Sequence, residues 1–155
     1  VLNLEEGVAA DAALLEAAAR AGAEVVALSA RVEAELGELS DEEAAEFLAA
    51  LGVAEPAVGR MIRAAYGALE LQSFFTVGPD ECRAWTVRRG SAAPVAAGVI
   101  HSDLQRGFIR AEVTAYDDLI AAGDMAAAKA ANKVRLEGKA YVVQDGDILE
   151  IRFSV

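Results

Sequence analysis

The sequence predicts an α/β unit followed by an α+β unit within 155 residues. Before residue 70, short apolar stretches alternate with alanine-rich helical stretches, whereas runs of β-branched and aromatic residues dominate after it. The charge divides in the same way: residues 1–79 contain 14 acidic and 4 basic residues, and residues 80–155 contain 11 and 10. We therefore expect two modules, residues 1–69 and residues 70–155, with the basic residues concentrated in the second.

The first module is expected to open with a strand, a helix and a second strand. VLNL and EVVALSA are apolar stretches typical of short buried strands. Between them, DAALLEAAARA has Asp11 in a capping position and Gly22 just beyond its end, which is the pattern of a helix start and stop. This order favours a parallel βαβ unit.

Two more helices complete the first module. In SDEEAAEFLAALG, Ser40 and Glu43 have the spacing of a capping box, and Gly52 ends the helix. Pro56 suits the first turn of the next helix, PAVGRMIRAAYGALEL. The amphipathic spacing predicts an inward-facing apolar stripe. Its expected members are Leu48, Leu51, Ile62, Tyr66 and Leu69.

Four runs in the second module have the composition of strands. They are CRAWTV, FIRAEVTAY, KAYVV and ILEIRFSV. A helix, DDLIAAGDMAAAKAANK, lies between the second and third runs and is interrupted by Gly123. Asp145 and Gly146 supply turn chemistry for a terminal hairpin between YVV and ILEIRFSV. This order of elements is that of a small β-grasp sheet, a mixed sheet wrapped around one helix.

Few residues point to catalysis or to a metal. The sequence contains no GxxxxGK(S/T), GxSxG, HExxH or CxxC. His101 and Asp103 have the spacing of a base and its orienting group, but without a visible nucleophile a structural or surface role is favoured. Cys82 is expected to be a buried or half-buried structural thiol. Asp145 and Asp147 are expected to form a turn rather than bind a metal.

Composition also restricts the compartment and the partners. No apolar run approaches the ~20 residues that a membrane-spanning helix requires, and no basic segment followed by an apolar one opens the chain. The single cysteine cannot form an internal disulfide. These observations predict a globular protein of the reducing cytoplasm with no membrane partner.

Five arginines of the second module are candidates for contact with an anionic partner. They are Arg83, Arg88, Arg89, Arg106 and Arg110. On adjacent strands they would form a basic face, with Trp85 and Phe108 interleaved, that could contact a phosphate backbone. The alternative is a solvated face with cross-strand ion pairs to Glu112 or Glu81. The residues alone leave both interpretations open.

The stretch VLNLEEG places Asn3 and an acidic residue at the expected carboxyl end of a strand, where α/β sheets bind ligands. The Asn3 carboxamide can bond N7 or an exocyclic group of a nucleotide base. One βα unit later, Leu28-Ser29-Ala30 ends the neighbouring strand with backbone N–H groups facing the same crevice. Together the two motifs predict the base-binding part of a nucleotide site.

Much of the chain resembles the C-terminal part of an Obg-like ATPase of the YchF family. The stretches that carry the likeness include VLNLEEG, VVALSARVEAEL, DEEAAEFLAALG, RAWTVRRG, AAGVIHSDLQRGFIRAEV and EGKAYVVQDGD. The resemblance implies that residues 1–69 are the end of a P-loop GTPase-type, Rossmann-like domain. It implies that residues 70–155 are a TGS domain, a ubiquitin-like β-grasp module.

The resemblance also implies that the bound nucleotide is ATP. The family's NxxE motif matches Asn3, Leu4 and Glu6, and it replaces the guanine-reading NKxD motif of related GTPases, which removes discrimination against adenine. By the same match Leu4 contacts the adenine through its backbone, and Ser29 and Ala30 flank the base. The family's phosphate loop, switch segments and Mg²⁺ ligands have no counterpart in this sequence, so the chain alone is expected to hydrolyse nothing.

In the intact parent, the resemblance implies a cytoplasmic nucleoside-triphosphate hydrolase that binds the ribosome through the large subunit or rRNA. The chain itself is expected to be a monomer. The alternative function is a non-catalytic β-grasp module that binds RNA, the ribosome or a protein, with the helical segment as a buttress. Binding of ribosomal subunits without binding of nucleotide would favour that alternative for this chain.

Overall fold

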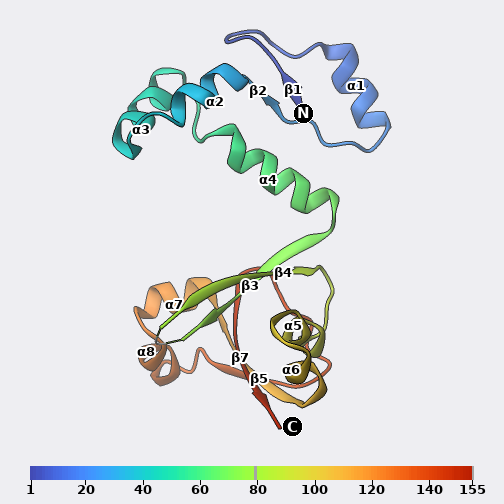
Figure 1. The fold of residues 1–155 in the computed structure, drawn as a ribbon, viewed down its shortest axis with the longest axis vertical. Helices are drawn as coiled ribbons and strands as arrows, with labels where there is room; N and C mark the ends of the chain where they lie inside the picture. Colours follow the sequence, from blue (N-terminus) through green and yellow to red (C-terminus); the bar gives the residue numbers. More distant parts are fainter. Residues whose placement is uncertain (79, 155) are drawn as a thin grey trace. The chain divides into compact units, whose positions relative to one another are not determined.

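The computed structural model describes residues 1–78 and 80–154. Two residues lie outside this description: Pro79, and Val155, which ends the expected terminal strand and the second module. The chain divides into two compact units, Val1–Leu69 (unit 1) and Glu70–Val155 (unit 2) (Figure 1).

Unit 1 combines a two-stranded parallel sheet with four helices. Strand β1 (Leu2–Asn3) pairs with β2 (Ala27–Leu28) in parallel, and helix α1 (Ala12–Arg20) connects them. The predicted βαβ unit is therefore confirmed, although each strand contains only two residues. The helices that follow are α2 (Ala30–Leu36), α3 (Asp41–Ala50) and α4 (Ala57–Ala68).

The helix starts of unit 1 agree with the capping patterns in the sequence. Asp11 accepts a hydrogen bond from the backbone N of Ala13 at 2.8 Å. Ser40 and Glu43 form the complete capping box at the start of α3. Pro56 is the residue before the first turn of α4, one position earlier than predicted. These contacts satisfy backbone N–H groups that have no partner inside a helix.

Only part of the predicted inward stripe is buried. Leu48 is 9% exposed, whereas Ile62 and Leu69 are 51% and 59% exposed, so the prediction is wrong for the last two. Leu51 and Tyr66 are half-buried. The reason lies in the small sheet of unit 1, because two strands of two residues offer no face broad enough to cover a helix of 12 residues.

Unit 2 is built on a five-stranded mixed sheet with the strand order β4-β3-β7-β5-β6. Strands β3 and β4 are antiparallel, β7 runs parallel to β3 and antiparallel to β5, and β6 is antiparallel to β5. The strand bounds are Leu71–Val77 (β3), Cys82–Arg88 (β4), Phe108–Ala115 (β5), Arg135–Glu137 (β6) and Asp147–Phe153 (β7).

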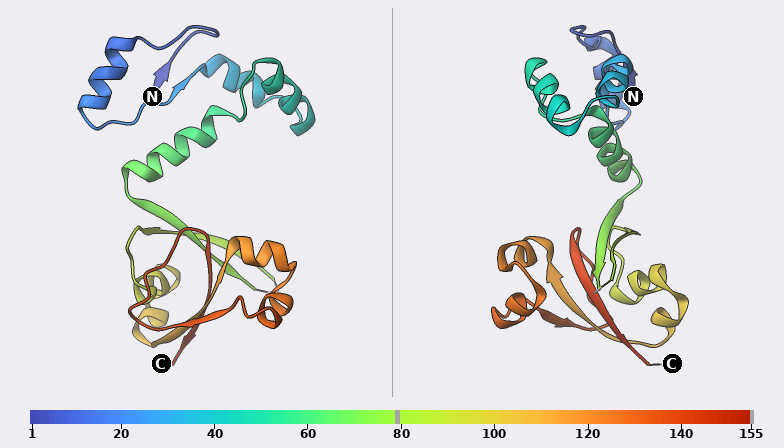
Figure 2. Two further views of the ribbon diagram at one scale, coloured as in Figure 1. Left: turned by 180° about the vertical axis from the view of Figure 1, so that it is seen from behind. Right: turned by 60° about the vertical axis from the view of Figure 1, so that its left-hand side comes forward.

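Helices cover the two sides of this sheet. Helices α5 (Ala93–Ile100) and α6 (Ser102–Arg106) lie on one side. Helices α7 (Tyr116–Ala122) and α8 (Met125–Ala130) lie on the other, as the right-hand view of Figure 2 shows. The predicted interruption at Gly123 is confirmed, because this residue ends α7 with a φ of +89°.

The core of unit 2 lies between the sheet and α5. Ten buried hydrophobic residues form one cluster there, against which Trp85, Ile100, Leu104, Tyr141 and Ile151 pack. The cluster comprises Phe74, Val87, Ala93, Ala96, Ala97, Phe108, Ala111, Val113, Val143 and Leu149. The alanines on α5 allow the helix to approach the sheet closely, and the aromatic residues fill the space beside it.

The predicted terminal hairpin is wrong. Strand β7 lies between β3 and β5, while residues 141–143 form only an isolated bridge, between Ala92 and Val142. Ile148 and Leu149 are 4% and 2% exposed. Neighbouring side chains of a strand point to opposite faces, so β7 is buried on both faces, in agreement with its central position in the sheet. The predicted turn is present, with Gly146 at a φ of +82°. Strands β3 and β6 lie outside the four predicted runs.

Candidate functional site

The two predicted base-binding motifs lie side by side in unit 1. Asn3 ends β1 and Leu28 ends β2, and the backbone N of Leu4 donates to the Leu28 carbonyl at 2.8 Å. The Asn3 Oδ1 accepts a hydrogen bond from the backbone N of Ala30 at 2.9 Å. The carboxyl ends of the two parallel strands are therefore joined by a side-chain contact, at the edge of the sheet where α/β proteins bind ligands.

The Asn3–Ala30 contact orients the Asn3 carboxamide. Its Oδ1 accepts from the backbone N of Ala30, and its Nδ2 amide can still donate outward. A donor suits N7 of a purine, which is an acceptor. The second lone pair of Oδ1 can still accept from the exocyclic amine of adenine, so both contacts expected of Asn3 remain available.

A cavity of about 360 Å³ opens beside these strand ends. Three of the five predicted residues line it, namely Leu4, Glu6 and Ser29, whereas Asn3 and Ala30 lie outside its lining. The remaining lining residues are Glu5, Gly7, Val8, Ala27, Leu28, Val32, Glu33, Leu48, Leu51, Val53 and Arg60. A lining that is mostly apolar with a few polar groups is typical of sites for small molecules and cofactors.

Ser29 also has a local structural role. It is the N-cap of α2, and its Oγ accepts from the backbone N of Val32 at 3.5 Å, which is long for a hydrogen bond. The half-buried hydroxyl is therefore weakly held at its cap position. It keeps its capacity to bond to an occupant of the cavity.

The sequence patterns missed Arg60. This residue of α4 lines the cavity and donates from Nη2 to the Ala27 carbonyl at 3.2 Å. Its Nε is buried without a hydrogen-bond partner in the described part of the chain. The one available signal is an arginine four positions after Pro56, within an otherwise apolar helix start, and that signal does not identify the partner strand.

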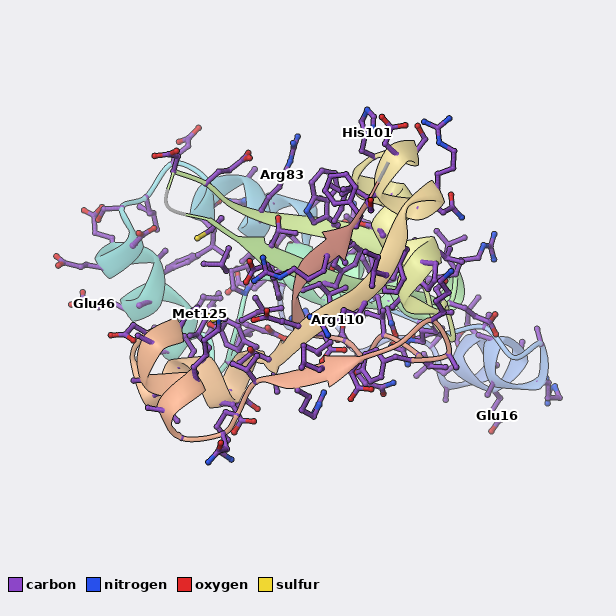
Figure 3. The ribbon with its side chains drawn as sticks, turned by 90° about the horizontal axis from the view of Figure 1, so that it is seen from below. Glu16, Glu46, Arg83, His101, Arg110 and Met125 are labelled. Atoms are coloured by element: carbon purple, nitrogen blue, oxygen red, sulfur yellow. The ribbon has the colours of Figure 1, made fainter. Side chains whose placement is uncertain are left out.

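The five arginines of unit 2 do not form one face. Arg83 and Arg88 lie on β4, with Arg89 next to it, whereas Arg110 lies on β5, and strands β3 and β7 separate the two. Arg106 ends α6 and forms an ion pair with Asp103. The prediction of adjacent strands is therefore wrong, and Figure 3 shows Arg83 and Arg110 on separate parts of the unit. Strand order in this sheet does not follow sequence order.

The expected interleaved aromatic residues are not available for stacking on bases. Phe108 is 3% exposed and belongs to the core. Trp85 is half-buried, and its Nε1 donates to the Thr76 Oγ1 at 3.0 Å. The Arg83 guanidinium carbon lies 4.6 Å from the centre of the Trp85 ring, a cation–π contact. The prediction that Trp85 and Phe108 are interleaved with the arginines on one face is therefore wrong for Phe108, which lies in the core.

The expected ion pairs are present in part. Arg83 Nε lies 3.9 Å from Glu81 Oε1. Glu112 forms ion pairs with other cations, with Arg152 at 2.8 Å and with Lys129 at 3.0 Å. The hydrogen bonds from these two side chains hold the pKa of Glu112 below its usual value. Arg88 and Arg89 take part in no ion pair among the described residues. Two of the five predicted arginines, both at the end of β4, therefore form no ion pair among the described residues.

The other candidate residues have local partners. The Nδ1 of His101 accepts from the backbone N of Asp103 at 3.2 Å and so caps α6, in agreement with a structural or surface role. Cys82 is exposed, so its predicted burial is wrong; it lies at the first position of the edge strand β4. Asp145 accepts from the backbone N of Ser73 at 2.8 Å. Asp147 is buried and accepts from the Tyr141 hydroxyl at 2.7 Å.

Residues 1–78 and 80–154 contain no group of three His, Cys, Asp or Glu side chains arranged to hold a metal ion. Within the same residues, no helix has the length and apolar character needed to cross a membrane.

The five-stranded sheet of unit 2 and the parallel strand pair of unit 1, with the helices around them, define a mixed α/β protein. The family model YchF-GTPase_C, described as "Protein of unknown function (DUF933)", matches residues 71–154. This match extends over more than half of the chain. The chain belongs to the YchF-GTPase_C family, and the predicted resemblance is confirmed.

Curated relatives agree with this assignment. The ribosome-binding ATPase YchF of Bacillus subtilis is 50% identical over 162 residues, with 100% of this chain and 44% of the relative covered. That of Haemophilus influenzae is 55% identical over 140 residues, with 90% and 39% covered. The Obg-like ATPase 1 of Rattus norvegicus is 48% identical over 133 residues, with 86% and 33% covered. The chain spans less than half the length of each relative.

Solved structures support the fold. The YchF GTPase of Schizosaccharomyces pombe superimposes with a TM-score of 0.75 at 38% identity, with 83% of this chain and 34% of that one covered. A GTP-binding protein of Pyrococcus horikoshii gives a TM-score of 0.64 at 20% identity, with 92% and 41% covered, which indicates a shared fold only. The chain therefore has a mixed α/β fold like that of YchF GTPases.

Proposed function

We propose that this chain is part of a ribosome-binding P-loop ATPase and that unit 1 supplies the wall that contacts the adenine of ATP. The observation that carries the proposal is the Asn3–Ala30 contact, which joins the ends of two parallel strands beside the 360 Å³ cavity. The relatives' names, ribosome-binding ATPase and Obg-like ATPase, support the same activity for the longer protein.

The residues at the cavity fit a base better than a phosphate. Leu4 offers backbone and an apolar side chain, Ser29 a hydroxyl, and Glu6 a carboxylate that accepts from an exocyclic amine. The lining carries three carboxylates, those of Glu5, Glu6 and Glu33, against one cation, Arg60, so its net negative charge disfavours a triphosphate. The β- and γ-phosphates and their Mg²⁺ therefore belong with other segments of the longer protein, which would also carry out hydrolysis.

Unit 2 is proposed to be a TGS-type β-grasp module that contacts ribosomal RNA. Arg88 and Arg89 lie at the end of the edge strand β4 and form no ion pairs among the described residues, so their charges are free to meet phosphates. A ribosomal partner implies a cytoplasmic location. We expect the chain to act there as a monomer.

The adenine proposal is tested by nuclear magnetic resonance titration of the isotope-labelled chain with adenosine, with guanosine as the matched control. We expect backbone signals of Leu4, Glu6, Ser29 and Ala30 to shift with adenosine, with a dissociation constant of ~1 mM because only the base and sugar are held. Guanosine should bind more weakly, and Glu6→Gln should reduce the difference. Equal binding of both nucleosides, or no shift at these residues, would reject the proposal.

The RNA proposal is tested with purified ribosomal subunits. Reversing Arg88 and Arg89 to Glu should weaken association and lower the slope of log K against log salt by about 1.5, since each lost phosphate contact removes roughly 0.7–0.9. Reversal of Arg20 and Arg31 is the matched control, because these two exposed arginines of unit 1 lie outside the proposed contact. A salt slope that is unchanged in the double variant would remove RNA contact by β4 and leave the protein-binding module as the function of unit 2.

A further inference from the structure

The outer edge of strand β2 is held by a side chain rather than by another strand. The carbonyls of Val26 and Leu28 accept from the backbone N of Leu2 and Leu4 at 2.9 and 2.8 Å, so both point toward β1. Because carbonyl direction alternates along a strand, the Ala27 carbonyl points to the opposite edge. Arg60 Nη2 donates to it there, at 3.2 Å.

A second contact fixes the helix that carries Arg60. The Glu33 carboxylate on α2 accepts from the backbone N of Ala57 at 2.8 Å and of Val58 at 3.3 Å. These are N–H groups of the first turn of α4, which have no partner inside the helix and favour a negative charge. Glu33 therefore sets the start of α4, and Arg60 follows within one turn.

The residues that make these two contacts with α4, Ala27 and Glu33, lie on either side of the proposed base-binding turn, Ser29–Ala30, in the sequence. Ala27 lies two positions before Ser29, and Glu33 lies three positions after Ala30. Helix α4 thus holds the segment on either side of the turn that Asn3 contacts. Since β2 contains only two residues, its own backbone hydrogen bonds contribute little to fixing the direction in which it ends.

We propose that Arg60 is a positioning residue of the base site. By donating to the Ala27 carbonyl from α4, it holds the end of β2 so that Ser29 and Ala30 meet Asn3 at the rim of the cavity. This inference rests on the proposed function of unit 1. It assigns a role in ligand binding to a residue of α4, outside both of the motifs that the sequence predicts.

Three variants of the 155-residue chain test the proposal, with adenosine as the probe. Arg60→Met keeps the length of the side chain and removes its donors, whereas Arg60→Lys keeps a donor. Arg63→Met is the matched control, because Arg63 lies one turn further along α4 and pairs with Glu55 instead of β2. We expect Arg60→Met to weaken adenosine binding about fivefold, the effect of one lost hydrogen bond. Arg60→Lys should restore most of the affinity.

A second measurement uses the unchanged chain. If the Arg60–Ala27 contact favours adenosine binding, adenosine must stabilise that contact by the same factor. Solvent exchange of the Arg60 guanidinium protons and of the Ala30 amide should then slow at saturating adenosine. This readout remains valid even if Arg60→Met unfolds unit 1.

The outcomes separate the inference from the proposed function. Failure of the unchanged chain to bind adenosine at all would overturn the base site itself. Binding by the unchanged chain, with the same affinity in Arg60→Met and in Arg63→Met, would overturn only the role of Arg60. Unchanged solvent exchange of the Arg60 guanidinium protons at saturating adenosine would also overturn the role of Arg60. Weaker binding in Arg60→Met, with rescue by Lys and slower exchange, supports the proposal.

Discussion

The two units of this chain are stabilised in different ways. In unit 2, ten buried hydrophobic residues form a single cluster under strands of seven or eight residues. In unit 1, the buried hydrophobic residues are Val26, Leu36, Leu48 and Ala57, which come from different elements, and the strands have two residues each. Apolar burial therefore dictates the fold of unit 2, and it does so only weakly in unit 1.

Polar contacts between side chains and backbone contribute more to the stability of unit 1. Asp11 and Ser40 cap helices, and Glu33 satisfies the start of α4. Asn3 and Arg60 join segments that lie 27 and 33 positions apart. A region held in this way can respond to a ligand at modest energetic cost, whereas a packed core resists change. The difference suits a binding wall in unit 1 and a rigid platform in unit 2.

The largest effect should come from opening the core of unit 2. Phe74 is fully buried in the cluster, so Phe74→Ala should cost about 3–5 kcal/mol of unfolding free energy. Urea unfolding followed by the fluorescence of Trp85, the only tryptophan, measures this directly. Ile62→Ala in α4 is the control and is followed by amide exchange in α4, because Trp85 reports on unit 2. This side chain is 51% exposed, so its loss should change the stability of unit 1 by less than about 0.5 kcal/mol. Equal losses would contradict the contrast between the units.

A smaller effect is expected from a polar group packed against that core. Burial, together with the hydrogen bond to Asp147, raises the pKa of Tyr141 to about 12. In the unfolded chain this hydroxyl ionises near its ordinary pKa of 10.0. The contribution of the Tyr141 hydroxyl to the free energy of unfolding is therefore complete below pH 10. It is lost as the pH rises toward 12, and the loss is about 2 kcal/mol.

The Tyr141 effect is checked by comparing urea unfolding below pH 10 with unfolding between pH 10 and about 12. The parent chain should lose more stability over this interval than Tyr141→Phe, which has no hydroxyl to ionise. Parallel losses in the two proteins would show that other groups cause the alkaline destabilisation.

The smallest effect concerns a cap in unit 1. Ser40→Ala removes one half of the capping box at α3 and should destabilise unit 1 by about 0.5–1 kcal/mol. Amide exchange in the first turn of α3 should quicken while the Trp85 signal stays unchanged. Ser102→Ala is the control, because His101 rather than Ser102 caps α6. A shift in the Trp85 unfolding curve would show that the units do not respond separately.

The sequence could predict what depends on neighbouring residues. The caps at Asp11 and Ser40, the break at Gly123 and the turn at Gly146 each need only a short stretch of chain. The order of apolar and helical stretches likewise predicted the parallel pair of β1 and β2. The Asn3 and Ser29 motifs were recognisable because each follows one of these strands directly.

Features that depend on distant pairing could not be predicted in the same way. Strand β7 does not pair with the run around Tyr141 that precedes it in the sequence. It pairs with β3 instead, where Ile148 lies opposite Phe75. The burial of Ile148 and Leu149, whose side chains point to opposite faces, agrees with this central position of β7. The arginines were assigned to adjacent strands because β4 and β5 are consecutive among the predicted runs, but two other strands lie between them. The Arg60–Ala27 contact has no pattern of its own in the sequence.

Amide hydrogen exchange across both units, with and without saturating adenosine, tests the central claim most directly. We expect slower exchange at Leu4 and Ala30, whose amides hydrogen-bond across the β1–β2 ends. We expect no change in the core strands of unit 2. Unchanged exchange at Leu4 and Ala30, or protection confined to unit 2, would contradict the assignment of the base-binding wall to unit 1.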